Sequence, residues 1–122
     1  MKNKFMNIPV IIFLAFLVFV VISSLIPASY NYYIPGLSDK MAHGIIYAVL
    51  ALLLCNVIGK VIQPNFIKIS LYSVTIASSI GGAIELLQFL SATRSPEIGD
   101  FFANFAGAIF GSFVWVIIRM FR

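Results

Sequence analysis

The chain has 122 residues, of which 61% are hydrophobic and only 10% are charged, and its mean hydropathy is +1.06. So apolar a composition excludes a soluble domain, whose surface must face water. The net charge of +4 does not indicate a nucleic-acid partner, because most of the cations flank hydrophobic runs, where they orient membrane helices. We therefore expect an integral protein of a lipid bilayer, with no nucleic acid among its partners.

Four hydrophobic stretches are long enough to cross a membrane as helices of about 20 residues. Lys2 and Lys4 precede the first stretch, but it is longer than the apolar part of a usual signal peptide, so we interpret it as a retained span. We expect Pro9 near its start, where a missing amide donor costs least. The expected spans are about 8–26, 39–58, 66–90 and 96–118. The predicted fold class is all-α, a single polytopic domain over residues 1–122 with four transmembrane helices in a compact bundle.

Two of these helices have recognisable start signals. Ser38 is placed to cap the second helix, with Asp39 in a first turn where the helix dipole favours an acid. Ser95-Pro96-Glu97 combines a capping hydroxyl, a proline at the first helical position and an acid in the first turn. We expect both helices to begin on the same side of the membrane.

Basic residues near the ends of the spans are distributed unequally between the two sides. Only Lys40 and Arg94 fall on the side where the second and fourth helices begin. The other side has Lys2, Lys4, Lys60, Lys68, Arg119 and Arg122. By the positive-inside rule, both termini should be cytoplasmic, and the linker before Ser38 and the loop with Arg94 should lie outside.

Three of the expected helices each have a polar stripe in the outer half of the membrane, because residues three or four apart share a helix face. The stripes are Lys40, His43 and Tyr47, with Asp39 at the edge; Ser78, Gly81, Glu85 and Gln88; and Asp100, Asn104, Gly107 and Gly111. An ionisable side chain that faces lipid costs a few kcal/mol. We therefore expect the stripes to face one another around an outward-facing polar pocket. The spacing of Gly107 and Gly111 also predicts close helix packing.

These residues resemble the VanZ-like family of small bacterial membrane proteins. The match consists of Ser38-Asp39-Lys40-x-x-His43-x-x-x-Tyr47, then Glu85-x-x-Gln88, Arg94 and Asp100-x-x-x-Asn104-x-x-Gly107-x-x-x-Gly111, and it covers roughly residues 35–115. The resemblance implies a multi-pass protein of the bacterial cytoplasmic (inner) membrane. The founding member of the family is associated with teicoplanin resistance, and the family provides no firmly assigned reaction to transfer.

The first functional hypothesis is that the pocket binds or modifies a lipid-linked, phosphate-bearing substrate of the cell envelope. His43 and Glu85 are the catalytic candidates, because they could exchange protons in a partly desolvated site, where Glu85 would position or deprotonate His43. Lys40 and Arg94 would bind phosphate oxygens, Asp100 would orient Arg94, and Asn104 would contact the headgroup. The substrate-binding candidates are Asp39, Lys40, Tyr47, Gln88, Arg94, Asp100 and Asn104.

Two alternatives use the same residues differently. In a non-catalytic accessory protein, the cluster is a charge network that neutralises itself, and the outer surface binds another cell-envelope membrane protein or a cell-wall precursor. A transporter would need a polar path through the cytoplasmic half, where only Asn56, Ser70 and Thr75 are available. The sequence decides neither whether the protein is an enzyme, nor its substrate, nor its oligomeric state, nor whether it confers drug resistance.

A divalent metal is a weaker hypothesis from the sequence. His43, Glu85 and Asp100 have suitable ligand chemistry, but no compact ligand-spacing motif connects them. The single cysteine, Cys55, lies in a hydrophobic run without a nearby histidine or second cysteine. From the sequence we therefore expect no metal and no other cofactor.

Overall fold

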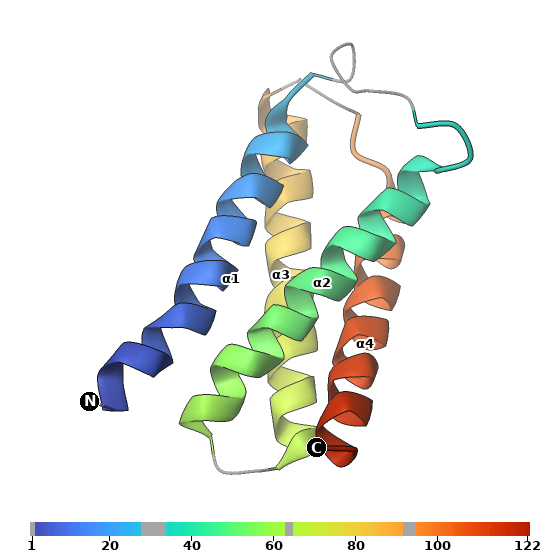
Figure 1. The fold of residues 1–122 in the computed structure, drawn as a ribbon. Coiled ribbons are helices and arrows are strands. Elements are labelled where there is room, and N and C mark those ends of the chain that lie inside the picture. Colours follow the sequence, from blue (N-terminus) through green and yellow to red (C-terminus); the bar gives the residue numbers. More distant parts are fainter. Residues whose placement is uncertain (1, 28–33, 63–64, 92–94) are drawn as a thin grey trace.

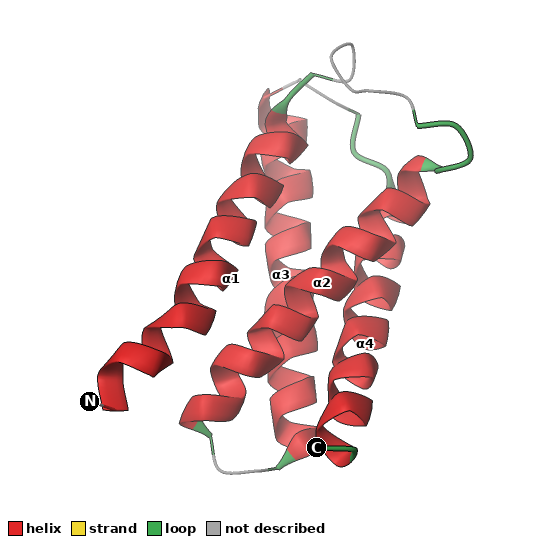
Figure 2. Ribbon diagram, in the orientation of Figure 1, coloured by secondary structure: helices red, strands yellow, loops and turns green. Residues whose placement is uncertain are grey.

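The computed structural model describes residues 2–27, 34–62, 65–91 and 95–122. Four helices make up this part of the chain: α1 (Lys2–Leu25), α2 (Asp39–Val61), α3 (Phe66–Ser91) and α4 (Ile98–Met120) (Figures 1 and 2). Each is long and apolar enough to cross a membrane. The prediction of an all-α bundle with four candidate transmembrane helices is confirmed.

Successive helices run in opposite directions, so α1 and α3 end where α2 and α4 begin (Figure 1). We call this the polar end of the bundle, because the acidic side chains of Asp39 and Asp100 and the imidazole of His43 lie there. Both termini lie at the opposite end. The most extensive helix contact is between α2 and α4, whereas α1 packs against α2 and α3. Only 6% of the α1 span is buried, so α1 lies at the edge of the bundle.

Among the described residues, the buried hydrophobic side chains form two clusters. The larger includes Val20, Tyr47, Leu50 and Ala77, and the smaller, nearer the opposite end, contains Cys55, Ile69 and Trp115. Large apolar side chains also cover the outside, with Phe89 and Phe110 about two-thirds exposed. Such a surface would be costly in water, whereas lipid chains can cover it. The exposed surface therefore agrees with a bilayer environment.

Glycines bring the backbones of α2 and α4 into contact. A Cβ added at Gly107 would overlap the backbone of Gly44, and one added at Gly111 would overlap the backbone of Ala48. Small residues allow membrane helices to approach this closely without large side chains between them. The packing predicted from the spacing of Gly107 and Gly111 is confirmed, and it brings the first turns of α2 and α4 together.

The predicted helix starts are correct for α2 and wrong in detail for two other helices. Ser38 caps α2, since its Oγ accepts a hydrogen bond from the backbone N–H of Met41 at 3.2 Å. α4 begins at Ile98, with Glu97 as its N-cap residue, and the Glu97 carboxylate pairs with Lys40 rather than capping the helix. α1 already begins at Lys2, so Pro9 lies inside the helix instead of in its first turn.

Candidate functional site

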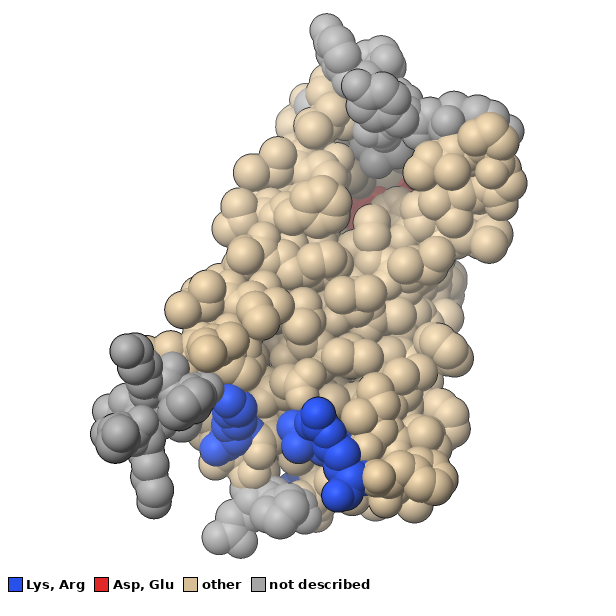
Figure 3. Space-filling view, viewed as in Figure 1, with Lys and Arg blue, Asp and Glu red and all other residues tan. Residues whose placement is uncertain are grey.

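The polar end combines side chains from the first two turns of α2 with side chains from the first two turns of α4. Lys40 and His43 come from α2, and Asp100 and Asn104 come from α4. Figure 3 shows acidic atoms set back from the surface at this end, whereas Lys and Arg side chains are visible near the opposite end. The contact between the backbones of α2 and α4 places these four residues within reach of one another.

Asn104 orients the imidazole ring of His43. Asn104 is 1% exposed, and its Oδ1 lies 2.9 Å from Nδ1 of His43. An amide oxygen only accepts hydrogen bonds, so Nδ1 carries the hydrogen and donates it. In the neutral ring the other nitrogen, Nε2, then has a free lone pair. The tautomer of His43 is thus set by a residue of the neighbouring helix.

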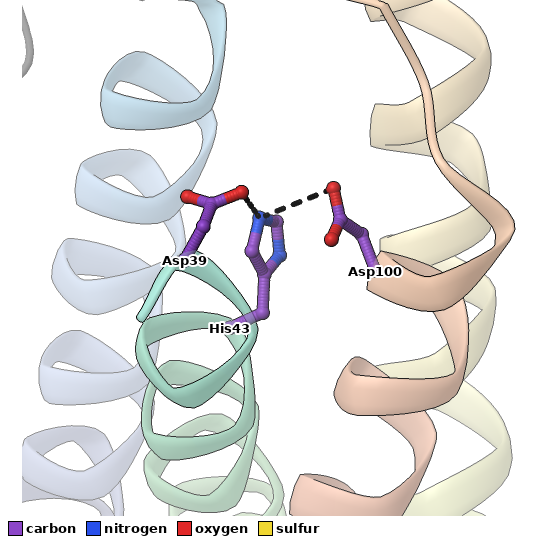
Figure 4. Close-up of side chains that lie close together, drawn as sticks. All are labelled: Asp39, His43 and Asp100. Carbon is purple, nitrogen blue, oxygen red and sulfur yellow. Dashed lines mark ion pairs between the residues drawn. The ribbon is translucent and has the colours of Figure 1, made fainter. Parts of the chain in front are cut away.

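Nε2 of His43 points between two carboxylates, one from each helix (Figure 4). It lies 3.8 Å from Oδ2 of Asp39 and 3.8 Å from Oδ2 of Asp100. Both distances exceed the 2.7–3.2 Å of an N–H···O hydrogen bond. Asp39 is solvent-exposed, whereas Asp100 is 7% exposed. The three side chains therefore face one another at the polar end of the bundle.

Lys40 connects this group to the residue before α4. Its Nζ lies 2.8 Å from Oε2 of Glu97 and 3.6 Å from Oδ1 of Asp100. The lysine crosses the first turn of α4 at Gly99, where an added Cβ would lie 2.8 Å from Cε of Lys40. The sequence pattern placed Glu97 as an acid in the first turn of the helix and did not predict this contact, because the two residues are distant in the chain.

The hydrogen bond and the positive charge of Lys40 lower the pKa of the Glu97 carboxyl. Because this pKa is lowered, the stability that the ionised Glu97 contributes is present above its unfolded-state pKa and is lost as the pH falls through its folded-state pKa. The side chains of Lys40 and Glu97 are 55% and 62% exposed, so water and salt screen the pair and it contributes little to stability. Lys40 is therefore accessible to a ligand at the mouth of the cluster.

A second layer of polar residues lies deeper in the bundle. Tyr47 and Glu85 are buried, and they interact electrostatically. Gly81 of α3 makes room for this layer, because an added Cβ there would lie 3.0 Å from both Nδ2 of Asn104 and Cε1 of Tyr47. Gly81 and Glu85 of the α3 stripe thus face α2 and α4, as the sequence predicts for this part of the stripe.

Gln88 has a different environment from the other predicted site residues. It is buried, and its Nε2 donates a hydrogen bond of 2.7 Å to the backbone oxygen of Ser24. Ser24 belongs to the last turn of α1, where backbone oxygens have no partner within the helix. Gln88 therefore connects α3 to α1 by a hydrogen bond, a contact that the sequence pattern did not predict.

The predicted site residues thus lie in different parts of the bundle. Lys40, His43, Asp39, Asp100 and Asn104 form the outer cluster. Tyr47 and Glu85 lie beneath it, and Gln88 contacts α1. Arg94 lies outside the described residues, and so does its predicted pairing with Asp100. The burial of Asn104 favours orientation of His43 over direct contact with a headgroup.

Metal-ligating side chains also meet in this cluster. Asp39, His43 and Asp100 each offer one ligand atom, and these atoms lie within 4.8 Å of one another. The group differs from the sequence hypothesis in one member, since Asp39 takes the place of Glu85. Asp39 and His43 are four residues apart on α2, so one helix face presents both.

Comparisons with protein-family models, with curated proteins and with solved structures found no match. The functional argument therefore depends on the chemistry of the polar end. That chemistry comprises one accessible ammonium group, one oriented imidazole and two carboxylates that face it, at the meeting point of two helix N-termini.

Proposed function

We propose that the chain is a VanZ-like membrane protein whose polar end binds the phosphate-bearing headgroup of a lipid-linked cell-envelope molecule, at the outer face of the bacterial cytoplasmic membrane. One observation supports this most strongly. Residues far apart in the sequence, Lys40 and His43 on α2 and Asp100 on α4, meet at one end of the bundle. They are also residues on which the family resemblance depends.

Two features of the polar end favour an anionic ligand. α2 and α4 both begin there, and helix N-termini present unpaired backbone N–H groups and a positive dipole end to anions. Lys40 adds a charged donor that is more than half exposed. A phosphate that arrives from the membrane surface would replace Glu97 as the partner of the Lys40 ammonium group.

His43 is the residue best placed for proton exchange with such a ligand. Asn104 holds Nδ1, so Nε2 is the nitrogen that faces the cluster. A bound headgroup that reacts would give its proton to Nε2 or receive one from it. Glu85 would act from the layer below, through its electrostatic interaction with Tyr47, rather than as the direct partner of His43.

The proposed orientation places the polar end outside and both termini in the cytoplasm. Lys60 and Arg119 support it, because they lie in the last turns of α2 and α4 at the opposite end. In a chain with Cys55→Ala, we expect a membrane-impermeant maleimide added to whole cells to label Ser91→Cys but not Val61→Cys. Both positions are exposed. Labelling of Val61→Cys alone would reverse the topology.

A binding assay tests the proposed ligand. We expect a polyprenyl monophosphate to bind the purified protein in nanodiscs of neutral lipid, and Lys40→Gln and His43→Gln to weaken binding at least tenfold. Lys60→Gln is the control, since it removes the same charge at the opposite end and should leave the affinity unchanged. Equal binding by all four proteins would contradict the proposal. Phosphatidylglycerol serves as the competitor, and equal competition by it would show general attraction to anionic lipid instead.

A structural charge network is the second candidate, and the internal pairing favours it. Lys40 lies near both Glu97 and Asp100, and Asn104 occupies one nitrogen of His43. In that case the groups neutralise one another, and the protein acts as a non-catalytic accessory to another membrane protein. The two functions predict different changes in the free energy of unfolding when Asp100 loses its charge: a large loss for the structural network, and little or no loss for the ligand site.

A further inference from the structure

Two carboxylates converge on the lone pair of His43, an arrangement that leaves negative charge facing an electron-rich nitrogen. The hydrogen bond to Asn104 places the hydrogen on Nδ1, so Nε2 of the neutral ring has none to offer Asp39 or Asp100. The closest oxygens of both aspartates are nevertheless 3.8 Å from Nε2. The three atoms are too far apart for direct hydrogen bonds and close enough to share a positively charged partner.

The burial of Asp100 is a second, independent observation. Asp100 is 7% exposed, and its Oδ1 is buried and accepts no hydrogen bond from the described residues. Among the described residues the cation that pairs with it is Nζ of Lys40, which lies 3.6 Å away and is held at 2.8 Å by Glu97. A buried carboxylate oxygen without a hydrogen bond is costly, and a coordinated cation is one of the few partners that offsets this cost.

We propose that Asp39, His43 and Asp100 form a binding site for a divalent transition-metal cation such as Zn²⁺. Their ligand atoms lie within 4.8 Å of one another. An ion centred among three such atoms lies less than about 3 Å from each, and small side-chain rotations bring them to the roughly 2.0–2.2 Å of zinc–nitrogen and zinc–oxygen bonds. The ligand set is one imidazole nitrogen and two carboxylate oxygens.

The surroundings of the three ligands suit this cation. Metal-binding histidines nearly always donate their other N–H to a fixed acceptor, and Asn104 is that acceptor here. An imidazole ligand favours Zn²⁺ and its neighbours in the first transition series over Ca²⁺ or Mg²⁺, which take oxygen ligands. Asp39 is exposed, so the cation can enter from the membrane surface and keep water in the remaining positions.

The proposed cation site does not depend on the proposed lipid, because the three side chains that would bind the cation all belong to the protein. If both proposals hold, a phosphate oxygen would replace a metal-bound water beside Lys40. The test below contains no phosphate-bearing lipid, so its failure and the failure of the proposed function are distinguishable.

His43 is the only histidine in the chain, which permits a direct test. Protein purified through a histidine-free tag, stripped with EDTA and labelled with ¹⁵N-histidine should give one imidazole in NMR spectra. We expect Zn²⁺ to bind with one-to-one stoichiometry in calorimetry and to shift the Nε2 resonance more than the Nδ1 resonance. A titration that leaves both resonances unmoved would overturn the site, and this readout needs no variant.

Variants then identify the oxygen ligands. Asp39→Asn and Asp100→Asn should each weaken Zn²⁺ binding at least tenfold, whereas Glu97→Gln should weaken it much less. Glu97 is the matched control because it is an acid at the same end, paired with Lys40, and outside the ligand group. Thermal unfolding without metal checks that each variant is folded. Asp39→Asn alters an exposed side chain, so it remains informative even if Asp100→Asn does not fold. Equal weakening by Glu97→Gln would contradict the assignment.

Discussion

Alanine in place of Gly107 or Gly111 is expected to destabilise the bundle by about 3 kcal/mol or more, at the upper end of the usual cost of overpacking. In each case the added methyl group would overlap the backbone of α2, at Gly44 or at Ala48. A backbone cannot rotate away as a long side chain can, so α2 and α4 would have to separate. Because their contact also aligns the two halves of the outer cluster, the His43–Asn104 hydrogen bond should be lost as well.

Gly44→Ala is the matched control for this prediction. Gly44 lies on the opposite side of the same helix contact, but a Cβ there would be 3.8 Å from the backbone oxygen of Ala103, an ordinary contact distance. We expect no loss of stability, and a gain of up to about 1 kcal/mol from the higher helix propensity of alanine. Reversible unfolding in mixed micelles measures all three variants. Equal stability of Gly44→Ala and Gly107→Ala would contradict the packing described for α2 and α4.

The sequence predicted the helices and their faces because these depend on local composition. Long apolar runs predict membrane-length helices, and the period of the α-helix shows that His43 and Tyr47 share a face. The spacing of Gly107 and Gly111 predicted a close helix contact, and the structure identifies α2 as the partner. The meeting of three polar stripes followed from the cost of exposing them to lipid.

The partner of each side chain could not be predicted in the same way. The polar face of a helix does not specify how far along its axis a neighbouring helix packs. The sequence analysis therefore named Glu85 as the residue that positions His43, whereas in the structure Asn104 contacts its Nδ1. The Gln88–Ser24 contact was missed because α1 is almost uniformly apolar and no pattern indicates its packing face. The start of α4 was shifted because Glu97 pairs with Lys40, a contact between distant parts of the chain.

Asp100 distinguishes most sharply between a functional site and a structural charge network. Asparagine is nearly the same size as aspartate, so Asp100→Asn removes the charge and retains the packing. If the cluster is a structural network, this change removes a buried partner charge of His43 and should cost about 3–5 kcal/mol. If the cluster is a site prepared for a ligand, the Asp100 carboxylate of the free protein has only a distant pairing with Lys40, at 3.6 Å, and its loss should cost little.

The geometry favours the second outcome. Oδ1 of Asp100 accepts no hydrogen bond from the described residues, and the nearest nitrogens of Lys40 and His43 are 3.6 and 3.8 Å from the carboxylate. Asp39 adds a second carboxylate within 4.8 Å, so removal of one charge relieves repulsion. The dipole of α4 favours an acid in its first turn by only about 0.3–1 kcal/mol, which limits the expected loss.

The most direct test of the account is therefore the unfolding free energy of Asp100→Asn, measured beside wild type in mixed micelles with EDTA and without phosphate-bearing lipid. We predict a stability equal to that of wild type within about 1 kcal/mol, or higher, together with loss of Zn²⁺ binding. A loss of about 3 kcal/mol or more would contradict the functional site and identify the polar end as a structural charge network.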